Sequence, residues 1–204
     1  EIRRFTADWE KTASLHLRLG HATALDTYQA NDRLREGDSE EIIDAAYTAW
    51  QKDLAEGLSS VLIAESRETV TALNLRARID RIANGDVEAD GVALHDGTMA
   101  GRGDLIITRA NNRRLTAGRG WVKNGDRWRV LHHHHDGSLT VRRENAHFGA
   151  TVTLPAAYVA TDAELAYAIT AHRAQGSTVD TAHALVDGPA MTRESFYVAM
   201  TRGR

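Results

Sequence analysis

The sequence Thr170-Ala171-His172-Arg173-Ala174-Gln175-Gly176-Ser177 directly follows the apolar run at residues 165–169 and is the most informative part of the chain. A short, continuous apolar run followed by a polar segment is typical of a buried strand that ends at a ligand site of an open α/β sheet. The glycine lets backbone amides approach a phosphate group. The stretch therefore predicts an α/β domain whose ligand lies at the carboxyl end of this strand.

Three side chains of this stretch suit a nucleic acid and a nucleotide. Thr170 can donate its hydroxyl to a DNA phosphate, His172 can stack or hydrogen-bond, and Gln175 can bridge a nucleotide and a strand. Each residue taken singly is explained as well by a polar loop with a turn glycine. The order of the whole string, directly after a predicted strand, favours the ligand site.

A second informative stretch closes the chain: Tyr197-Val198-Ala199-Met200-Thr201-Arg202-Gly203-Arg204. It reads as an amphipathic helix with a basic last turn, which the helix dipole favours. The alternative interpretation makes Arg202 an arginine finger, because a guanidinium is planar, always charged and able to hold a γ-phosphate at two points.

Composition limits the function classes. The 204 residues are 42% apolar and carry a formal charge of -3, so a core is expected and a uniformly basic nucleic-acid binder is excluded. The absence of cysteine excludes disulfides and thiolate metal sites. No apolar run approaches the ~18 residues of a membrane span, and no signal peptide opens the sequence. We expect a cytoplasmic protein without a membrane partner.

Residues 1–83 read as mostly helical. Asp38 and Glu41 have the spacing of a capping box, and Gly20 and Gly57 are placed to end helices. Residues 60–64 form a continuous apolar run that predicts a buried parallel strand, and a helical pattern through residues 70–82 follows at once. A strand followed by a helix is half of a βαβ unit.

The pattern changes between residues 91 and 155. Turn pairs such as Asp96-Gly97, Asn124-Gly125 and Asp136-Gly137 separate short apolar runs, which predicts a small antiparallel barrel. Beyond Pro155 we predict core strands at 165–169 and 182–186 and a helix at 193–200. The predicted organisation is an α/β domain built from residues 1–95 and 155–204, with residues 96–154 inserted.

The two stretches quoted above resemble motifs V and VI of superfamily 1 helicases, specifically the superfamily 1B or RecD-type enzymes. The sequence of residues 167–180 is most similar to the helicase part of MobF/TraA-type conjugative relaxases. The resemblance extends over nearly the whole chain, through Arg4, residues 9–15, 61–64 and Leu73-Asn74. It implies a second RecA-like motor domain of the P-loop NTPase type, with an SH3-like β-barrel as the insert.

The same resemblance implies an ATP-dependent helicase that moves 5′ to 3′ on single-stranded DNA, with ATP and Mg²⁺ as cofactors. It assigns catalytic roles to Arg202, Arg4 and Gln175, with Arg3 as the alternative to Arg4. It assigns nucleotide binding to Gly176, Arg202 and Arg4. It assigns DNA binding to Thr170, His172 and Arg173.

Two departures limit this implication. The chain has no G-x-x-x-x-G-K-[ST] phosphate loop, and the acidic magnesium ligand of a first motor domain is also missing. We therefore interpret the chain as a monomeric fragment of a longer protein, inactive alone, whose partner is the first motor domain. Thr178 stands where some relatives carry an acidic residue that can hold the sugar, which leaves the ribose contact open.

Other function classes remain open at this stage. A non-catalytic DNA-binding or interaction module derived from a helicase domain is the main alternative. The run His132–His135 suggests a metal-dependent hydrolase, but alternate histidines of a strand point to opposite faces, so we favour a polar hairpin and no metal site. Trp121 and Trp128 suit DNA stacking, although core packing is the simpler interpretation.

Overall fold

The computed structural model describes the chain except for residues 1–4, 6, 145–148, 175–178, 187–190 and 204. The chain forms two compact units, one from Glu1–Val70 with Ile169–Arg204 and the other from Thr71–Ala168. We call them the first and the second unit. Helix α4 (Arg67–Ala83) begins in the first unit and ends in the second.

The first unit is built on a three-stranded sheet with the order β11-β1-β12, formed by β11 (Ala168–Thr170), β1 (Ser60–Ala64) and β12 (Thr181–Ala184). β1 and β12 are parallel, with Ser60 opposite Thr181 and Ile63 opposite Ala184. All five residues of β1 are buried, as expected for a strand covered on both faces. The predicted strand at 60–64 and the predicted parallel α/β sheet are confirmed.

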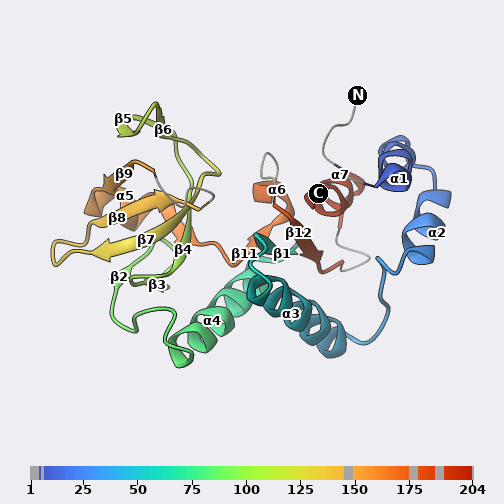
Figure 1. The fold of residues 1–204 in the computed structure, drawn as a ribbon, viewed down its shortest axis with the longest axis horizontal. Helices are drawn as coiled ribbons and strands as arrows, with labels where there is room; N and C mark the ends of the chain where they lie inside the picture. Colours follow the sequence, from blue (N-terminus) through green and yellow to red (C-terminus); the bar gives the residue numbers. More distant parts are fainter. Residues whose placement is uncertain (1–4, 6, 145–148, 175–178, 187–190, 204) are drawn as a thin grey trace. The chain divides into compact units, whose positions relative to one another are not determined.

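Helices cover this sheet and extend beyond it (Figure 1). α3 (Ser39–Ala55) packs against β1 and β12, and its start is capped by the Asp38 carboxylate, which accepts a hydrogen bond from the Glu41 backbone amide. The predicted capping residue is thus confirmed. The remaining helices of this unit are α1 (Asp8–Leu19), α2 (Thr23–Ala30), α6 (Ala171–Ala174) and α7 (Arg193–Met200).

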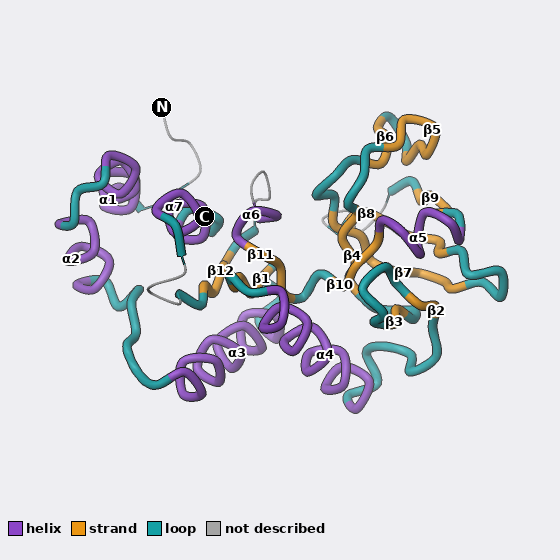
Figure 2. The backbone as a smooth tube through the Cα atoms, turned by 180° about the vertical axis from the view of Figure 1, so that it is seen from behind, coloured by secondary structure: helices purple, strands orange, loops and turns teal. Residues whose placement is uncertain are grey.

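A small apolar cluster joins α1, α2 and α7, which lie together in both backbone views (Figure 2). Ala13, Leu17, Ala24 and Tyr28 form its buried centre, and Phe196, Tyr197 and Met200 of α7 pack against it. α1 ends at Gly20, whose φ of 81° is the left-handed conformation that glycine adopts most readily. The cluster fixes α7 by its apolar face.

The second unit contains a five-stranded antiparallel sheet with the order β10-β4-β7-β8-β9. Its strands are β4 (Leu105–Thr108), β7 (Arg127–His133), β8 (Leu139–Arg143), β9 (Thr151–Leu154) and β10 (Ala163–Leu165). Two short antiparallel pairs accompany it: β2 (Val92–Ala93) with β3 (Met99–Ala100), and β5 (Asn112–Ala117) with β6 (Gly120–Val122). α5 (Ala156–Asp162) leads into β10.

The predicted turn pairs fall at turns of this unit. Gly97, Gly125 and Gly137 all have positive φ, between 81° and 85°. Asp96 and Asp136 each accept hydrogen bonds from the backbone amide and the hydroxyl two residues later, at Thr98 and Ser138. Hydrogen bonds between the aspartate side chain and its own turn stabilise the turn, which explains why Asp-Gly pairs occur where the chain reverses direction.

One sequence prediction is wrong. Residues 165–169 do not form a single core strand, because Leu165 ends β10 of the antiparallel sheet and Ala168 begins β11 of the parallel sheet. Ala166 and Tyr167 link the two strands, and both are fully buried. The apolar run therefore belongs to two different sheets. None of the described helices is long and apolar enough to cross a membrane.

Candidate functional site

The first part of the candidate site is the end of β11 with the short helix α6. Thr170 ends the strand, and its hydroxyl accepts a long hydrogen bond of 3.4 Å from the Arg173 backbone amide, so Thr170 caps α6. The His172 side chain is exposed, whereas Thr170 and Arg173 are half-buried. The three side chains proposed to contact DNA therefore share one short, surface-lying segment.

The second part is the end of α7, where Arg202 is buried with 6% of its surface exposed. Its Nε donates to the Val198 carbonyl at 2.9 Å, and one terminal nitrogen donates to the Thr201 hydroxyl at 3.1 Å. The Thr201 hydroxyl in turn donates to the Tyr197 carbonyl at 2.7 Å. These bonds satisfy carbonyls at the end of the helix and hold the guanidinium at that end.

Arg202 also connects the two parts. Its other terminal nitrogen donates to the carbonyl of Ala174, the last residue of α6, at 3.3 Å. Arg202 is thus bonded to the last described residue before Gln175. Gln175, Gly176 and Thr178, like Arg3 and Arg4, lie outside the described residues.

Polar contacts also fix the strand that leads towards α7. The Asp180 carboxylate accepts hydrogen bonds from the Ser59 backbone amide at 3.0 Å and from its hydroxyl at 2.8 Å, directly before β12 and β1. His183 of β12 lies 2.7 Å from the Asp53 carboxylate of α3. The sheet below the candidate site is thus tied at both a strand end and a helix.

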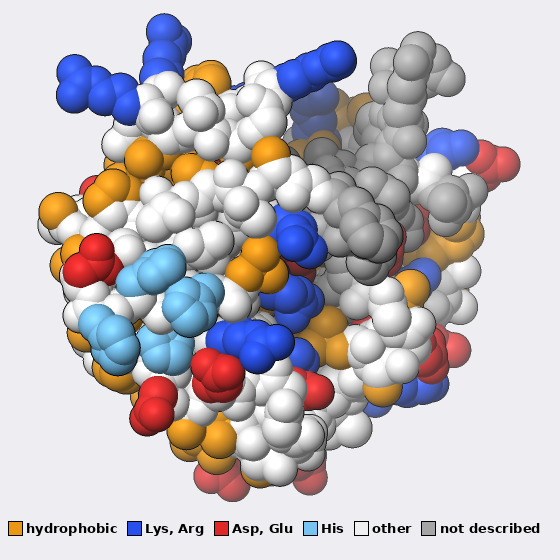
Figure 3. Space-filling view, turned by 60° about the vertical axis from the view of Figure 1, so that its left-hand side comes forward, with side chains coloured by type: hydrophobic (Ala, Val, Ile, Leu, Met, Phe, Trp, Pro, Cys, Tyr) orange, Lys and Arg blue, Asp and Glu red, His pale blue; other side chains and the backbone are white. Residues whose placement is uncertain are grey.

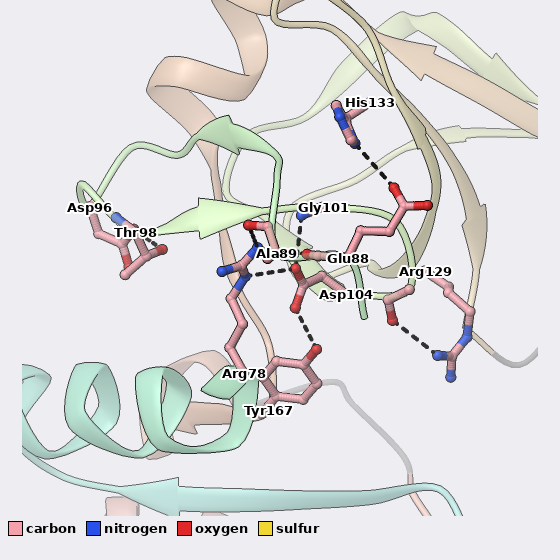
Figure 4. A network of polar contacts seen from close by, with 11 residues as sticks. Arg78, Glu88, Ala89, Asp96, Thr98, Gly101, Asp104, Arg129, His133 and Tyr167 are labelled. Atoms are coloured by element: carbon pink, nitrogen blue, oxygen red, sulfur yellow. Dashed lines mark hydrogen bonds and ion pairs between the residues drawn. The ribbon is translucent and has the colours of Figure 1, made fainter. Parts of the chain in front are cut away.

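The second unit holds a buried polar network around Asp104, shown in Figure 4. The fully buried carboxylate accepts from Arg78 at 2.9 Å, from the Tyr167 hydroxyl at 2.6 Å and from the Gly101 amide at 2.8 Å. Burial raises the pKa of the Asp104 carboxyl, against the opposing effect of these donors. Burial also raises the pKa of the Tyr167 hydroxyl, which therefore acts as a donor.

The network fastens α4 to segments that flank the strands of the second unit. Arg78 of α4 donates further hydrogen bonds to the carbonyls of Glu88 and Ala89, which precede β2. Asn74, one turn earlier in α4, accepts from the Ala168 amide at 2.8 Å and donates to the Ala168 carbonyl at 3.0 Å. Asn74 thus pairs with the backbone as a strand would, just where β11 begins.

The two tryptophans have different environments. Trp128 is fully buried, donates its indole N–H to the Thr108 hydroxyl at 3.2 Å and lies under the Arg143 guanidinium, so the core-packing interpretation is confirmed for it. Trp121 of β6 is half-buried and carries Arg113 and Lys123 over its ring.

The histidine run lies where β7 turns into β8. His134 shares a hydrogen bond of 2.9 Å with the Thr140 hydroxyl of β8, and the rings of His132 and His134 meet edge to face, with 4.6 Å between their centroids. Within the described part of the chain, no three histidine or acidic side chains gather as a metal site. The run is part of a polar hairpin.

Sequence reasoning missed the Asp104 network and the cations around Trp121. A buried carboxylate has no periodic signature, and Arg78, Asp104 and Tyr167 are far apart in sequence. The density of arginines at residues 113–119 was the available signal for the second feature.

No protein-family model matches the sequence. The chain is related along its whole length to a probable conjugal transfer protein TraA of Sinorhizobium fredii, with 30% identity over 207 residues. A conjugal transfer protein TraA of Agrobacterium fabrum is also 30% identical over 207 residues. In both cases the chain spans 18% of the relative's length.

Solved Pif1 helicases share the fold. A Bacteroides Pif1 bound to single-stranded DNA aligns with the whole chain at a TM-score of 0.62 and 17% identity, over 48% of that protein. Pif1 from Candida albicans aligns with 99% of the chain at a TM-score of 0.61 and 13% identity, over 52% of its own length. The core architecture is therefore that of the RecA-like α/β class.

Proposed function

We propose that this chain, a relative of the TraA conjugal transfer proteins with the fold of a Pif1 segment, is the second motor domain of an ATP-dependent DNA helicase. The parent protein is a conjugative relaxase that moves 5′ to 3′ on single-stranded DNA. The first motor domain, outside this chain, supplies the phosphate loop and holds most of ATP and Mg²⁺. The β region at residues 96–154 is an SH3-like insert.

The observation that carries this proposal is the hydrogen bond from Arg202 to the last carbonyl of α6. It brings a guanidinium to the end of α6, the short helix that follows β11 of the α/β sheet, and ligands of such sheets gather at the carboxyl ends of strands. When ATP is hydrolysed, negative charge spreads over the transferred phosphoryl group, and a positioned guanidinium stabilises that charge. Arg4, Gln175 and Gly176 are the further groups proposed for the nucleotide.

DNA binding is assigned to the other end of the same short helix. Thr170, His172 and Arg173 combine a hydroxyl, an exposed aromatic ring and a cation within four residues. A hydroxyl and a guanidinium suit phosphate oxygens, while an imidazole ring can stack on a base. Because α6 joins these residues to Ala174 and the Arg202 contact, a change on the DNA side has a short path to the nucleotide side.

The test of the nucleotide role is the Arg202→Ala variant of the parent protein. We expect ATP turnover to fall by about 10³-fold, the scale of an arginine finger, and Arg202→Lys to restore little because an ammonium lacks the planar fork. Affinity for single-stranded DNA without nucleotide should change little. Arg18→Ala, which removes an exposed arginine of α1 in the same unit, is the matched control.

If Arg202→Ala leaves DNA-stimulated turnover within a few fold of the wild type, the finger assignment is wrong and a non-catalytic DNA-binding module is the better description. The chain alone should not hydrolyse ATP, because the phosphate-binding half of the site belongs to the first motor domain. Steady ATP hydrolysis by the purified 204-residue chain, after contaminating ATPases are excluded, would contradict the proposal that the first motor domain is needed for catalysis.

The DNA role has a separate test. Thr170→Ala should weaken binding of a single-stranded oligonucleotide and reduce the stimulation of ATP turnover by DNA, with basal turnover largely kept. Thr12→Ala, at an exposed position of α1, removes a hydroxyl without touching α6 and serves as the control. Equal DNA affinity for the two variants would remove Thr170 from the proposed strand contacts.

A further inference from the structure

The β5–β6 hairpin concentrates positive charge in a chain that is acidic overall. Residues 111–123 contain Arg113, Arg114, Arg119 and Lys123 and no acidic residue, whereas the whole chain carries a net charge of -3. All four side chains are exposed. Figure 3 shows Lys and Arg side chains that project from the upper edge of the face on which the second unit is seen. A local cationic patch of this kind attracts a polyanion even when the total charge does not.

The hairpin is a separate ribbon with an organised base. Among the described residues, β5 and β6 form a two-stranded sheet of their own, and their register is irregular between Asn112 and Thr116. Below the ribbon, Arg143 donates to the Trp121 carbonyl at 2.9 Å and forms an ion pair with Asp126 at 2.9 Å. The Asp126 carboxylate also accepts a hydrogen bond from the Lys123 amide at 2.8 Å, so Asp126 is bonded to the base of the ribbon.

Trp121 organises two of the cations. The Arg113 guanidinium lies 5.5 Å and the Lys123 ammonium 5.4 Å from the centre of its indole ring, both within the range of a cation–π contact. The ring is therefore used by the protein's own side chains, and base stacking would have to displace them. Ordering two long side chains in advance lowers the conformational entropy lost when they bind phosphates.

We propose that the β5–β6 hairpin binds the phosphate backbone of double-stranded DNA without reading its sequence. A two-stranded ribbon lined with exposed arginines matches a duplex, whose axis carries one negative charge per ~1.7 Å, twice the density of one of its strands. Because Arg113 and Lys123 lie over the Trp121 ring, this ring is poorly suited to stack on the bases of a single strand. The inference takes DNA as the polymer from the proposed function, and it adds a second contact, separate from α6.

The experiment compares the wild-type chain with a hairpin variant, Arg113→Gln, Arg114→Gln, Arg119→Gln. Binding of a labelled 20-base-pair duplex and of one of its strands alone is measured between about 50 and 200 mM salt, a range over which phosphate contacts dominate the change in affinity. The control variant, Arg76→Gln, Arg102→Gln, Arg129→Gln, removes the same charge from exposed positions elsewhere in the second unit. Thermal unfolding of both variants checks that each remains folded.

We expect the hairpin variant to bind the duplex at least tenfold more weakly at low salt, and the slope of log affinity against log salt to fall by about 2 to 3, near one per lost cation. The control variant should keep the wild-type slope. An equal loss in both variants, or a larger loss on the single strand than on the duplex, overturns the proposal.

A Thr170→Ala arm separates the two proposals. Loss of single-strand binding in Thr170→Ala with duplex binding kept supports the α6 assignment independently of the hairpin. If Thr170→Ala binds the single strand normally while the hairpin variant loses duplex binding, the α6 assignment fails and the hairpin inference stands.

Discussion

Two groups of polar side chains, one around Asp104 in the second unit and one at α6 in the first, differ in how tightly the protein holds them. In the second unit, Asp104, Tyr167 and Asn74 are buried and bonded to backbone or to one another, so they hold segments together. In the first unit, His172 lies exposed on a four-residue helix and Thr170 makes one long hydrogen bond. The buried polar groups therefore hold segments of the second unit together, while the less constrained side chains at α6 remain accessible to a ligand.

Removal of the Asp104 carboxylate should have the largest effect on stability. Asp104→Ala leaves the half-buried Arg78 guanidinium and the buried Tyr167 hydroxyl without their shared acceptor, and breaking a buried ion pair typically costs about 3–5 kcal/mol. Urea unfolding of the chain measures the loss. Asp8→Ala, which breaks an exposed pair with Lys11, should leave the unfolding midpoint nearly unchanged. Equal midpoints for the two variants would show that the Asp104 network does not stabilise the second unit.

The Asn74 amide should rank second. Asn74→Ala leaves the buried Ala168 N–H without an acceptor, and an unsatisfied buried group costs about 1–3 kcal/mol. The exposed Asn31, whose amide donates to the Thr27 carbonyl, provides the matched Asn31→Ala control, with a smaller loss. Amide hydrogen exchange at Ala168 gives a local reading, because protection there should fall in the Asn74 variant alone.

His172→Ala should affect DNA binding and not stability. An exposed side chain of this kind contributes within about 0.5 kcal/mol to stability. We expect unchanged unfolding but several-fold weaker binding of a single-stranded oligonucleotide, compared with His16→Ala on α1 as the control. A clear loss of stability without a loss of DNA affinity would make His172 a structural residue.

The smallest expected effect concerns the exposed Asp136 turn. Hydrogen bonds from the Ser138 hydroxyl and amide lower the pKa of the Asp136 carboxyl. The carboxylate form is therefore favoured in the fold, and its stabilising contribution is present above the ordinary pKa and lost as pH falls through the lowered one. Ser138→Ala should move the pKa, followed by NMR titration of the Asp136 side chain, back towards the ordinary value. An unchanged titration would show that the hydroxyl contributes nothing.

Local elements were predictable because they depend on nearby residues. The strand at 60–64, the helix at 193–200 and the Asp38 cap are each encoded by a continuous pattern or by a fixed short spacing. The pairing of one strand with another is not encoded by such local patterns. The apolar run at 165–169 looked like one strand because hydrophobicity does not reveal that Leu165 pairs with β4 while Ala168 enters another sheet.

The candidate site was predictable only as a set of residues. The motif resemblance pointed to Thr170 and Arg202, but the approach of Arg202 to Ala174 joins residues that are 28 positions apart. That contact depends on how α7 packs against α1 and α2 through its apolar face. The packing of α7 depends on contacts made by many residues across the whole unit, and the spacing of residues within one segment does not predict such contacts.

The register of β1 with β12 has a kinetic consequence. Ser60 pairs with Thr181, and between them lies the whole antiparallel unit, whose strands mostly pair with near neighbours in the chain. Closing a loop of that length loses conformational entropy before the contacts between β1 and β12 form. Closing the short β7–β8 hairpin loses less entropy. We therefore expect the inserted unit to fold first and bring its two ends together. During synthesis, the parallel sheet that carries Thr170 then assembles late, once β12 has left the ribosome.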